Sequence, residues 1–208
     1  MIAILFDIDD TLYLERDYVH SGFLAVGAAA GCPEFGERCW TLFLDGVRGN
    51  TFDLARTEFP QVAMPTTQLV SIYRNHVPAI SLCADARRFL EDTRLRTGIV
   101  TDGPLPSQRA KFLALGLLPW IECPLFTTEI GTKKPAPAPF QLVARTLDVP
   151  YRECAYVADN PAKDFAGPKS LGMQTIRIRR PGSLHYDVPS GTDVDREIAS
   201  FDEIAEKG

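Results

Sequence analysis

The sequence predicts an α/β protein in which a parallel sheet is flanked by helices and interrupted, near its start, by an inserted all-helical segment. From about residue 81 onward, apolar runs of strand length alternate with helical patterns, joined by short connections. Such alternation is typical of a parallel sheet with helices on both faces. The first apolar run, at residues 1–6, is separated from this alternation by about 65 residues that show helical spacing and no strand pattern.

The elements of the α/β part follow in order along the chain. The run "MIAILF" is continuously apolar, as expected for a strand buried on both faces of a sheet. Four further strands are expected at "TGIVT", "CPLFTT", "CAYVAD" and "QTIRI". Helices are expected at "ADARRFLEDTR", "PSQRAKFLALG" and "PAPFQLVARTLD", with a short one ending at Gly172 that starts near Pro168 or is kinked there. The last segment, "DREIASFDEIAEKG", suggests one more strand and a closing helix.

The inserted segment is expected to form a domain of its own. Four or five helices are predicted there, separated by Gly31, Pro33, Gly49, Pro60 and Pro65. The predicted boundaries therefore assign residues 1–13 and 81–208 to the α/β core and residues 14–80 to the helical insert.

Composition and charge argue against some classes of binding partner. The 208 residues carry a net charge of -5 and lack long basic runs, which argues against nucleic acid or an anionic membrane as the main partner. No apolar stretch approaches the roughly 20 residues of a membrane span. The five cysteines are scattered without a C-x-x-C pair, so free thiols and a cytoplasmic location are expected.

Polar side chains follow several of the predicted strands. Ligands of open parallel sheets bind beyond the carboxyl ends of the strands, so these side chains should converge. They are Asp7, Asp9, Asp10, Thr101, Asp102, Lys133, Lys134, Asp159, Asn160 and Asp164. Converging carboxylates require a compensating cation, and oxygen ligands without clustered histidine or cysteine favour a hard ion such as Mg²⁺. A lysine and a threonine nearby suggest a bound anion, and together these groups indicate phosphoryl chemistry.

The spacing of the first aspartates suits covalent catalysis. One carboxylate can attack phosphorus and form an aspartyl-phosphate. A second, two residues later, can protonate the leaving oxygen and then activate water. Lys134 would neutralise charge on the nucleophile and the phosphoryl oxygens, and Thr101 with nearby backbone N–H groups would hold the transferring group.

Four short motifs, "DIDDT", "VTDG", "KKP" and "ADNPAKD", occur in this order along the chain. In these motifs the sequence resembles the haloacid dehalogenase (HAD) superfamily, in its phosphatase branch. The resemblance implies a Rossmann-like doubly wound core, with the insert as a C1-type helical cap between the first and second motifs. The fourth motif reads "VADN", with Ala158 where many members carry glycine.

The resemblance also implies a role for each matching residue. Asp7 is expected to be the nucleophile and a metal ligand, and Asp9 the general acid/base with its carbonyl on the metal. Thr101 and the amide of Asp102 are expected to bind phosphate, and Lys134 to stabilise it. Asp159 is the expected direct metal ligand from the fourth motif. Asp164 is expected to act through a metal-bound water or by orienting the lysine, and Asn160 to support the groups around the metal.

The function implied is a magnesium-dependent phosphatase that acts on a small phosphorylated metabolite of the nucleotide, flavin or sugar phosphate class. A phosphomutase or phosphotransferase of the same family, or a silent member that acts as a binding module, stays open, whereas the acid at Asp9 argues against a dehalogenase. Candidate substrate contacts from the insert and its edge are Tyr13, Arg16, Arg48 and Asn50. The substrate, the oligomeric state and the purpose of the loop from Arg179 to Tyr186 stay open.

Other polar residues are interpreted as structural. Asp10 is expected to serve a turn or a helix cap, and Lys133 to be solvated. His20, His76 and His185 lack the spacing of a metal site or a triad and are expected at the surface or in packing.

Overall fold

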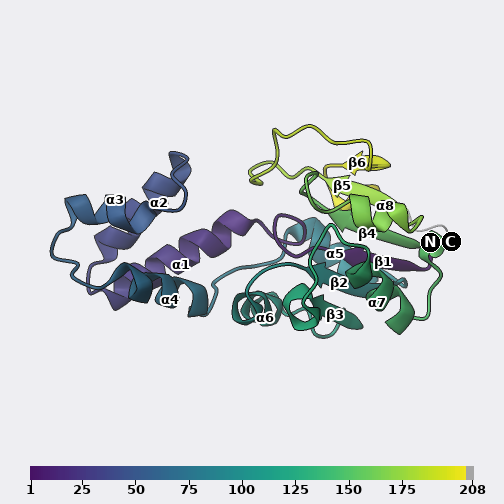
Figure 1. Ribbon diagram of the computed structural model, residues 1–208, viewed down its shortest axis with the longest axis horizontal. Helices are drawn as coiled ribbons and strands as arrows, with labels where there is room; N and C mark the ends of the chain where they lie inside the picture. The colour runs from purple at the N-terminus through teal and green to yellow at the C-terminus, as the bar shows by residue number, and fades with distance from the viewer. Residues whose placement is uncertain (205–208) are drawn as a thin grey trace. The chain divides into compact units, whose positions relative to one another are not determined.

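The computed structural model describes residues 1–204, and the chain divides into two compact units (Figure 1). One unit, here called the core unit, comprises Met1–Glu15 and the chain from Ser81 onward. The other, here called the helical unit, is Arg16–Ile80. These divisions lie within two residues of the boundaries that the sequence predicts.

The core unit is built on one parallel sheet. Among the described residues it has six strands in the order β3-β2-β1-β4-β5-β6, every neighbouring pair being parallel. This confirms the predicted α/β fold. The strands are β1 (Ala3–Phe6), β2 (Arg96–Thr101), β3 (Cys123–Phe126), β4 (Cys154–Ala158), β5 (Gln174–Ile178) and β6 (Arg196–Ile198).

The central strands are buried because helices cover both faces of the sheet. Successive side chains of β1 point to opposite faces. Leu5 joins a cluster with Phe140 of α7 on one face, and Phe6 packs against Phe89 of α5 and Phe201 on the other. The helices of this unit are α5 (Ala84–Asp92), α6 (Leu105–Ala114), α7 (Ala138–Thr146) and α8 (Ala166–Ser170). Short 3₁₀ turns lie at η1 (Thr127–Ile130), η2 (Tyr151–Glu153) and η3 (Phe201–Glu203).

Two predictions for the last part of the chain, a helix that starts near Pro168 and a closing helix, can be compared with the structure. Pro168 is the third residue of α8, where a backbone N–H would have no partner within the helix, so the proline is accommodated at the helix start as expected. The predicted closing helix is wrong in the part described, because after β6 the chain forms only the turn η3. The remainder of that prediction falls on residues 205–208, outside the described residues.

The helical unit consists of α1 (Glu15–Ala29, whose first residue belongs to the core unit), α2 (Pro33–Leu44), α3 (Thr51–Glu58) and α4 (Thr66–Asn75). Its core is rich in aromatic side chains, with Phe23 and Phe52 packed edge to face at 5.8 Å between ring centroids. Helices α1 and α2 approach closely through glycine. A Cβ placed on Gly36 would lie 2.5 Å from the carbonyl oxygen of Phe23.

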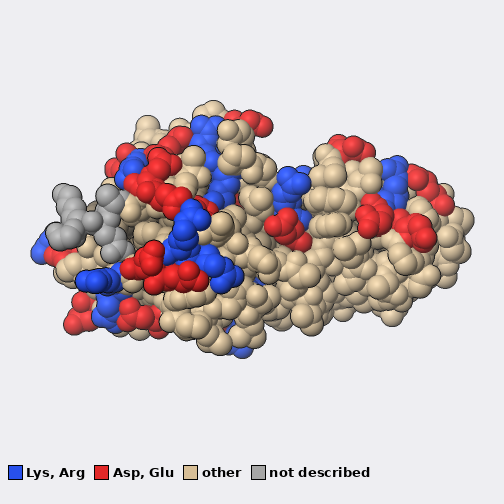
Figure 2. All heavy atoms as spheres, turned by 180° about the vertical axis from the view of Figure 1, so that it is seen from behind, with Lys and Arg blue, Asp and Glu red and all other residues tan. Residues whose placement is uncertain are grey.

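Charged side chains of both signs are mixed on the surface. Figure 2 shows Lys and Arg interspersed with Asp and Glu on the face drawn, rather than gathered into one basic area. Between residues 1 and 204 no helix combines the length and the apolar character that crossing a bilayer requires. All five cysteines are free thiols, as predicted.

The contact between α1 and α2 generates a stability prediction. Gly36→Ala should lower the free energy of unfolding by about 1–2 kcal/mol, because overpacking against a backbone carbonyl exceeds the gain in helix propensity. Urea unfolding of the purified chain measures this. Gly191→Ala is the control, since a Cβ there would meet no atom within 4 Å, and equal stability of the two variants would contradict the packing argument.

Candidate active site

The site lies between β1 and β4, at the point of the parallel sheet where the strand order reverses. The backbone N–H of Asp7 donates to the carbonyl of Val157 at 3.0 Å, which extends the pairing of the two strands by one residue. Strand β2 continues the sheet on one side of β1 and β5 on the other side of β4. Ligands of doubly wound sheets bind at such a switch point, beyond the carboxyl ends of the strands.

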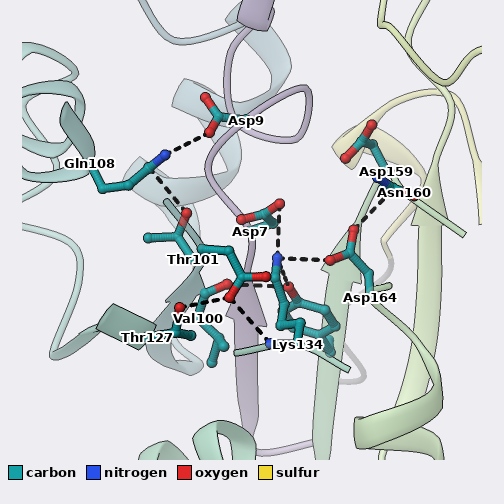
Figure 3. Close-up of polar contacts among 12 residues, drawn as sticks. Asp7, Asp9, Val100, Thr101, Gln108, Thr127, Lys134, Asp159, Asn160 and Asp164 are labelled. Atoms are coloured by element: carbon teal, nitrogen blue, oxygen red, sulfur yellow. Dashed lines mark hydrogen bonds and ion pairs between the residues drawn. The ribbon is translucent and has the colours of Figure 1, made fainter. Parts of the chain in front are cut away.

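Lys134 stands at the centre of the site (Figure 3). Its Nζ lies 3.0 Å from Asp7 Oδ2, 2.7 Å from Asp164 Oδ1 and 3.1 Å from the hydroxyl of Tyr156. Its side chain is fully buried. Burial alone would lower the pKa of Lys134, but the carboxylates of Asp164 and Asp7 raise it well above its usual value. The lysine is therefore held charged between two carboxylates.

Three buried carboxylates meet beside this lysine. Oxygens of Asp7, Asp159 and Asp164 lie within 4.8 Å of one another. Burial raises the pKa of Asp159 and of Asp164, although positively charged or donating neighbours act in the opposite direction. Among the described residues, Asp7 Oδ1 is buried without a hydrogen-bond partner. An unsatisfied carboxylate oxygen in an all-oxygen cluster fits a hard divalent cation such as Mg²⁺.

The second motif fixes the loop that carries Lys134. The Asp102 carboxylate accepts from the Thr127 hydroxyl at 2.7 Å and from the backbone N–H of Lys134 at 3.2 Å. Its carboxylate is thus used in positioning, which leaves its amide as the group predicted to bind phosphate. Thr101, at the end of β2, is buried and donates its hydroxyl to Gln108 Oε1 at 3.1 Å.

Asp9 is surrounded by partners that the sequence did not reveal. Lys111 Nζ lies 2.7 and 2.9 Å from its two oxygens, and Gln108 Nε2 donates to Oδ2 at 2.9 Å. Burial would raise the pKa of Asp9, but Lys111 and the hydrogen bonds lower it. Gln108 and Lys111 are three residues apart on α6, and both are buried. In the sequence alone these two residues look like part of the polar, solvent-facing side of a helix, so they carried no signal of a site.

Asp10 takes the structural role that was predicted. It adopts a positive φ of 51°, and its carboxylate accepts from the N–H of Glu15, the first residue of α1, at 2.8 Å. Its other oxygen accepts from the N–H of Leu184 at 2.7 Å. Burial raises the pKa of Asp10 to about 6.

The fourth motif contacts a histidine that was expected at the surface or in packing. His185 Nδ1 lies 2.9 Å from Asp159 Oδ2, and its Nε2 lies 3.1 Å from Asn160 Nδ2. No spacing signal marks this pair in the sequence, because the two residues are 26 positions apart. By contrast, His20 stacks on Trp40 and His76 packs beside Tyr18, as expected.

Of the four candidate substrate contacts, Tyr13 is fully buried and donates its hydroxyl to Asp9. It therefore contacts the predicted acid, on a side away from solvent. The other three belong to the helical unit, and their contact with a substrate stays a prediction. Arg16 is half-buried, while Arg48 lies over the ring of Phe43 at 3.8 Å and donates to its carbonyl. Arg48 and Asn50 line a cavity of about 300 Å³ within that unit.

The comparison with protein families agrees with this geometry. The model of haloacid dehalogenase-like hydrolases matches residues 1–172. The chain belongs to this family. It is thus a hydrolase of the HAD superfamily, as the four motifs indicated.

The curated relatives of this chain are named as phosphatases. A glyceraldehyde 3-phosphate phosphatase of Methanopyrus kandleri is 37% identical over 44% of this chain and 39% of its own length. An enzyme of the same name from Methanocaldococcus jannaschii is 24% identical over 98% of this chain and 95% of its own. Four further relatives named as phosphatases are also matched over less than half of their own length. A HAD phosphatase from Thermococcus onnurineus has a similar structure, with 26% identity, a TM-score of 0.61, and coverage of 98% of this chain and 95% of that chain.

The buried ion cluster generates a prediction about stability. Lys134→Met should lower the free energy of unfolding by about 3–5 kcal/mol in metal-free buffer, because two buried carboxylates lose their cation. The double variant Lys134→Met/Asp164→Asn should recover part of this loss, since one of those charges is also removed. Lys133→Met, which alters an exposed neighbour, should unfold like the wild type. A Lys134→Met variant as stable as the control would contradict the cluster's role.

Proposed function

We propose that this chain is a magnesium-dependent phosphatase that hydrolyses a small phosphorylated metabolite through an aspartyl-phosphate on Asp7. The observation that carries the proposal is the state of the Asp7 carboxylate. One oxygen is neutralised by Lys134, and the other is buried with no hydrogen-bond partner in the part of the chain that the structure describes. A carboxylate in this state is available to a cation and to an electrophilic phosphorus.

The chain's residues divide the first step between them. A carboxylate oxygen of Asp7 attacks phosphorus, and the ester P–O bond breaks. Asp9 gives its proton to the departing alkoxide oxygen. Mg²⁺, held by Asp7, Asp159 and the carbonyl of Asp9, would neutralise charge on the phosphoryl oxygens. Thr101 and the amide of Asp102 hold those oxygens, and Lys134 adds a fixed positive charge.

The second step returns the enzyme to its starting state. Water attacks phosphorus, the bond between Asp7 and phosphorus breaks, and Asp9 accepts the proton of the water. In this structure Lys111, Gln108 and Tyr13 favour the ionised form of Asp9, which is the form that this step requires. To act as the acid in the first step, Asp9 must release some of these contacts and take up a proton.

The acid at position 9 supports phosphoryl transfer over dehalogenation, because a halide leaving group needs no proton. The phosphatases named among the relatives act, by their names, on small phosphorylated compounds such as glyceraldehyde 3-phosphate. The candidate substrates are therefore sugar phosphates and other small phosphomonoesters, nucleotides and flavin mononucleotide included. Selection among them would fall to the helical unit, where Arg16, Arg48 and Asn50 are the candidate contacts.

The reaction class is tested by phosphate release from a panel of such phosphomonoesters. The wild type should release phosphate with Mg²⁺ and not with EDTA. Asp7→Asn should reduce turnover to background while it keeps the fold, because the nucleophile is lost. Asp92→Asn, a change at an exposed aspartate, is the control. Near wild-type turnover by Asp7→Asn would show that the nucleophile lies elsewhere.

The role of Asp9 gives a separate prediction. Asp9→Asn should slow both the formation and the hydrolysis of the aspartyl-phosphate, each by about 10²–10⁴-fold, since both steps use its proton transfer. Rapid quench followed by acyl-phosphate trapping resolves the two rates. An effect on neither rate would remove Asp9 from the mechanism.

A further inference from the structure

The loop between β5 and β6, whose purpose the sequence left open, is fastened to the acidic edge of the sheet by a buried arginine. Arg177, the fourth residue of β5, is completely buried. Its Nε donates to the carbonyl of Asp159 at 3.0 Å, and its Nη2 to the carbonyl of His185 at 2.7 Å. The third donor, Nη1, reaches the hydroxyl of Ser190 at 2.8 Å. One guanidinium thus joins the end of β4 to two points of the loop.

These contacts fix the backbone around His185 from both directions. On its N-terminal side, the N–H of Leu184 donates to Asp10 Oδ2 at 2.7 Å. At the residue itself, the carbonyl is held by Arg177. The imidazole is therefore placed by bonds to the first and fourth motifs, rather than by contacts within the loop alone.

A chain of hydrogen bonds determines which atom of His185 faces Asp159. The N–H of Ala162 donates to Asn160 Oδ1 at 3.0 Å, which fixes the orientation of that amide. Asn160 Nδ2 then faces His185 Nε2 at 3.1 Å, so Nε2 is the acceptor. The hydrogen of the neutral ring accordingly sits on Nδ1 and is donated to Asp159 Oδ2 at 2.9 Å. The charged ring would donate the same Nδ1–H, so this contact does not depend on the protonation state.

The hydrogen bond from His185 determines how the Asp159 carboxylate is oriented. With one oxygen occupied by His185, the other is left for the cation beside Asp7 and Asp164. Asp10, Asp159 and His185 also lie within 4.8 Å of one another. However, both oxygens of Asp10 already accept N–H groups, and both nitrogens of His185 have partners. Asp7 Oδ1, which has no hydrogen-bond partner among the described residues, belongs to the other cluster.

We infer that His185 is a positioning residue for the metal site, which orients the Asp159 carboxylate through Nδ1–H and thereby raises the affinity for Mg²⁺. This inference rests on the proposed function, in which Asp159 is a metal ligand. Hydrogen bonds to ligating carboxylates typically change metal affinity by 10–100-fold when removed. The loop thus contributes to metal binding without supplying a ligand.

The test measures Mg²⁺ binding directly, by isothermal titration calorimetry on the full chain after EDTA treatment and dialysis. His185→Ala should weaken Mg²⁺ binding by about 10–100-fold. His185→Asn should stay within about threefold of the wild type, because an asparagine Nδ2 can take the place of the histidine Nδ1 donor. Tyr186→Ala, the control in the same loop, should bind like the wild type, since its side chain stacks on Arg179 instead.

The results of these titrations separate a failure of the inference from a failure of the proposed function. His185→Ala with wild-type affinity, or His185→Asn as weak as His185→Ala, would overturn the inference. A loss of the same size in Tyr186→Ala would also overturn it, because the whole loop and not the donor would then be responsible. Absence of Mg²⁺ binding by the wild type would instead contradict the proposed function itself. Thermal unfolding of each metal-free variant verifies that the fold is kept.

Discussion

The ion pairs of Lys134 with Asp7 and Asp164 are the constraint on which the rest of the site depends. A buried ammonium and two buried carboxylates are costly to desolvate, and they persist only if they neutralise one another in good geometry. Asp7 follows β1, Asp164 follows β4 and Lys134 precedes α7, so the cluster joins three separate segments. With Asp159, the four groups carry three negative charges and one positive charge. The remaining imbalance of two negative charges is the one that a divalent cation would neutralise.

Two aspartates that follow β1, two positions apart, have opposite environments. Among the described residues, Asp7 keeps one buried oxygen without a hydrogen bond, whereas both oxygens of Asp9 are occupied by Lys111, Gln108 and Tyr13. The first arrangement favours reaction with an electrophile, and the second favours a stable carboxylate that is held in place. Because α6 supplies two of the three partners of Asp9, the helix after the second motif controls the acid/base as well as the threonine at the end of β2.

The sequence predicted the parts of the site that depend on strand ends. Asp7, Thr101 and Asp159 follow or end apolar runs that were recognisable as strands, and parallel strands bring their carboxyl ends to one edge of the sheet. Gln108, Lys111 and His185 could not be predicted in the same way. Their partners lie 99, 102 and 26 residues away along the chain. A lysine on an amphipathic helix looks like a solvent-facing residue until its partner is known.

Which side chains contact the substrate could not be predicted from the sequence, and the physical reason is a different one. Tyr13 was expected at a substrate, but its ring is buried, and its hydroxyl satisfies Asp9. Arg48, a candidate substrate contact, donates through Nη1 to the carbonyl oxygens of Phe43 and Val47, and its contact with a substrate stays a prediction. Polar side chains near a site first satisfy the groups around them, and sequence does not show how much donor capacity is left.

The segment after residue 172 extends the site beyond the part of the chain that the family model matches. Arg180 shows how: its Nε donates to the carbonyl of Thr11 at 2.8 Å, and its Nη1 pairs with Asp85 at 2.9 Å. Asp85 in turn accepts from the N–H of Phe201 at 2.8 Å. The turn that follows the two aspartates proposed to be catalytic is therefore held from the C-terminal side by an arginine, as Asp159 is held by Arg177. Since these bonds join the motif backbone to the last third of the chain, changes there can move the proposed metal ligands while every motif residue stays the same.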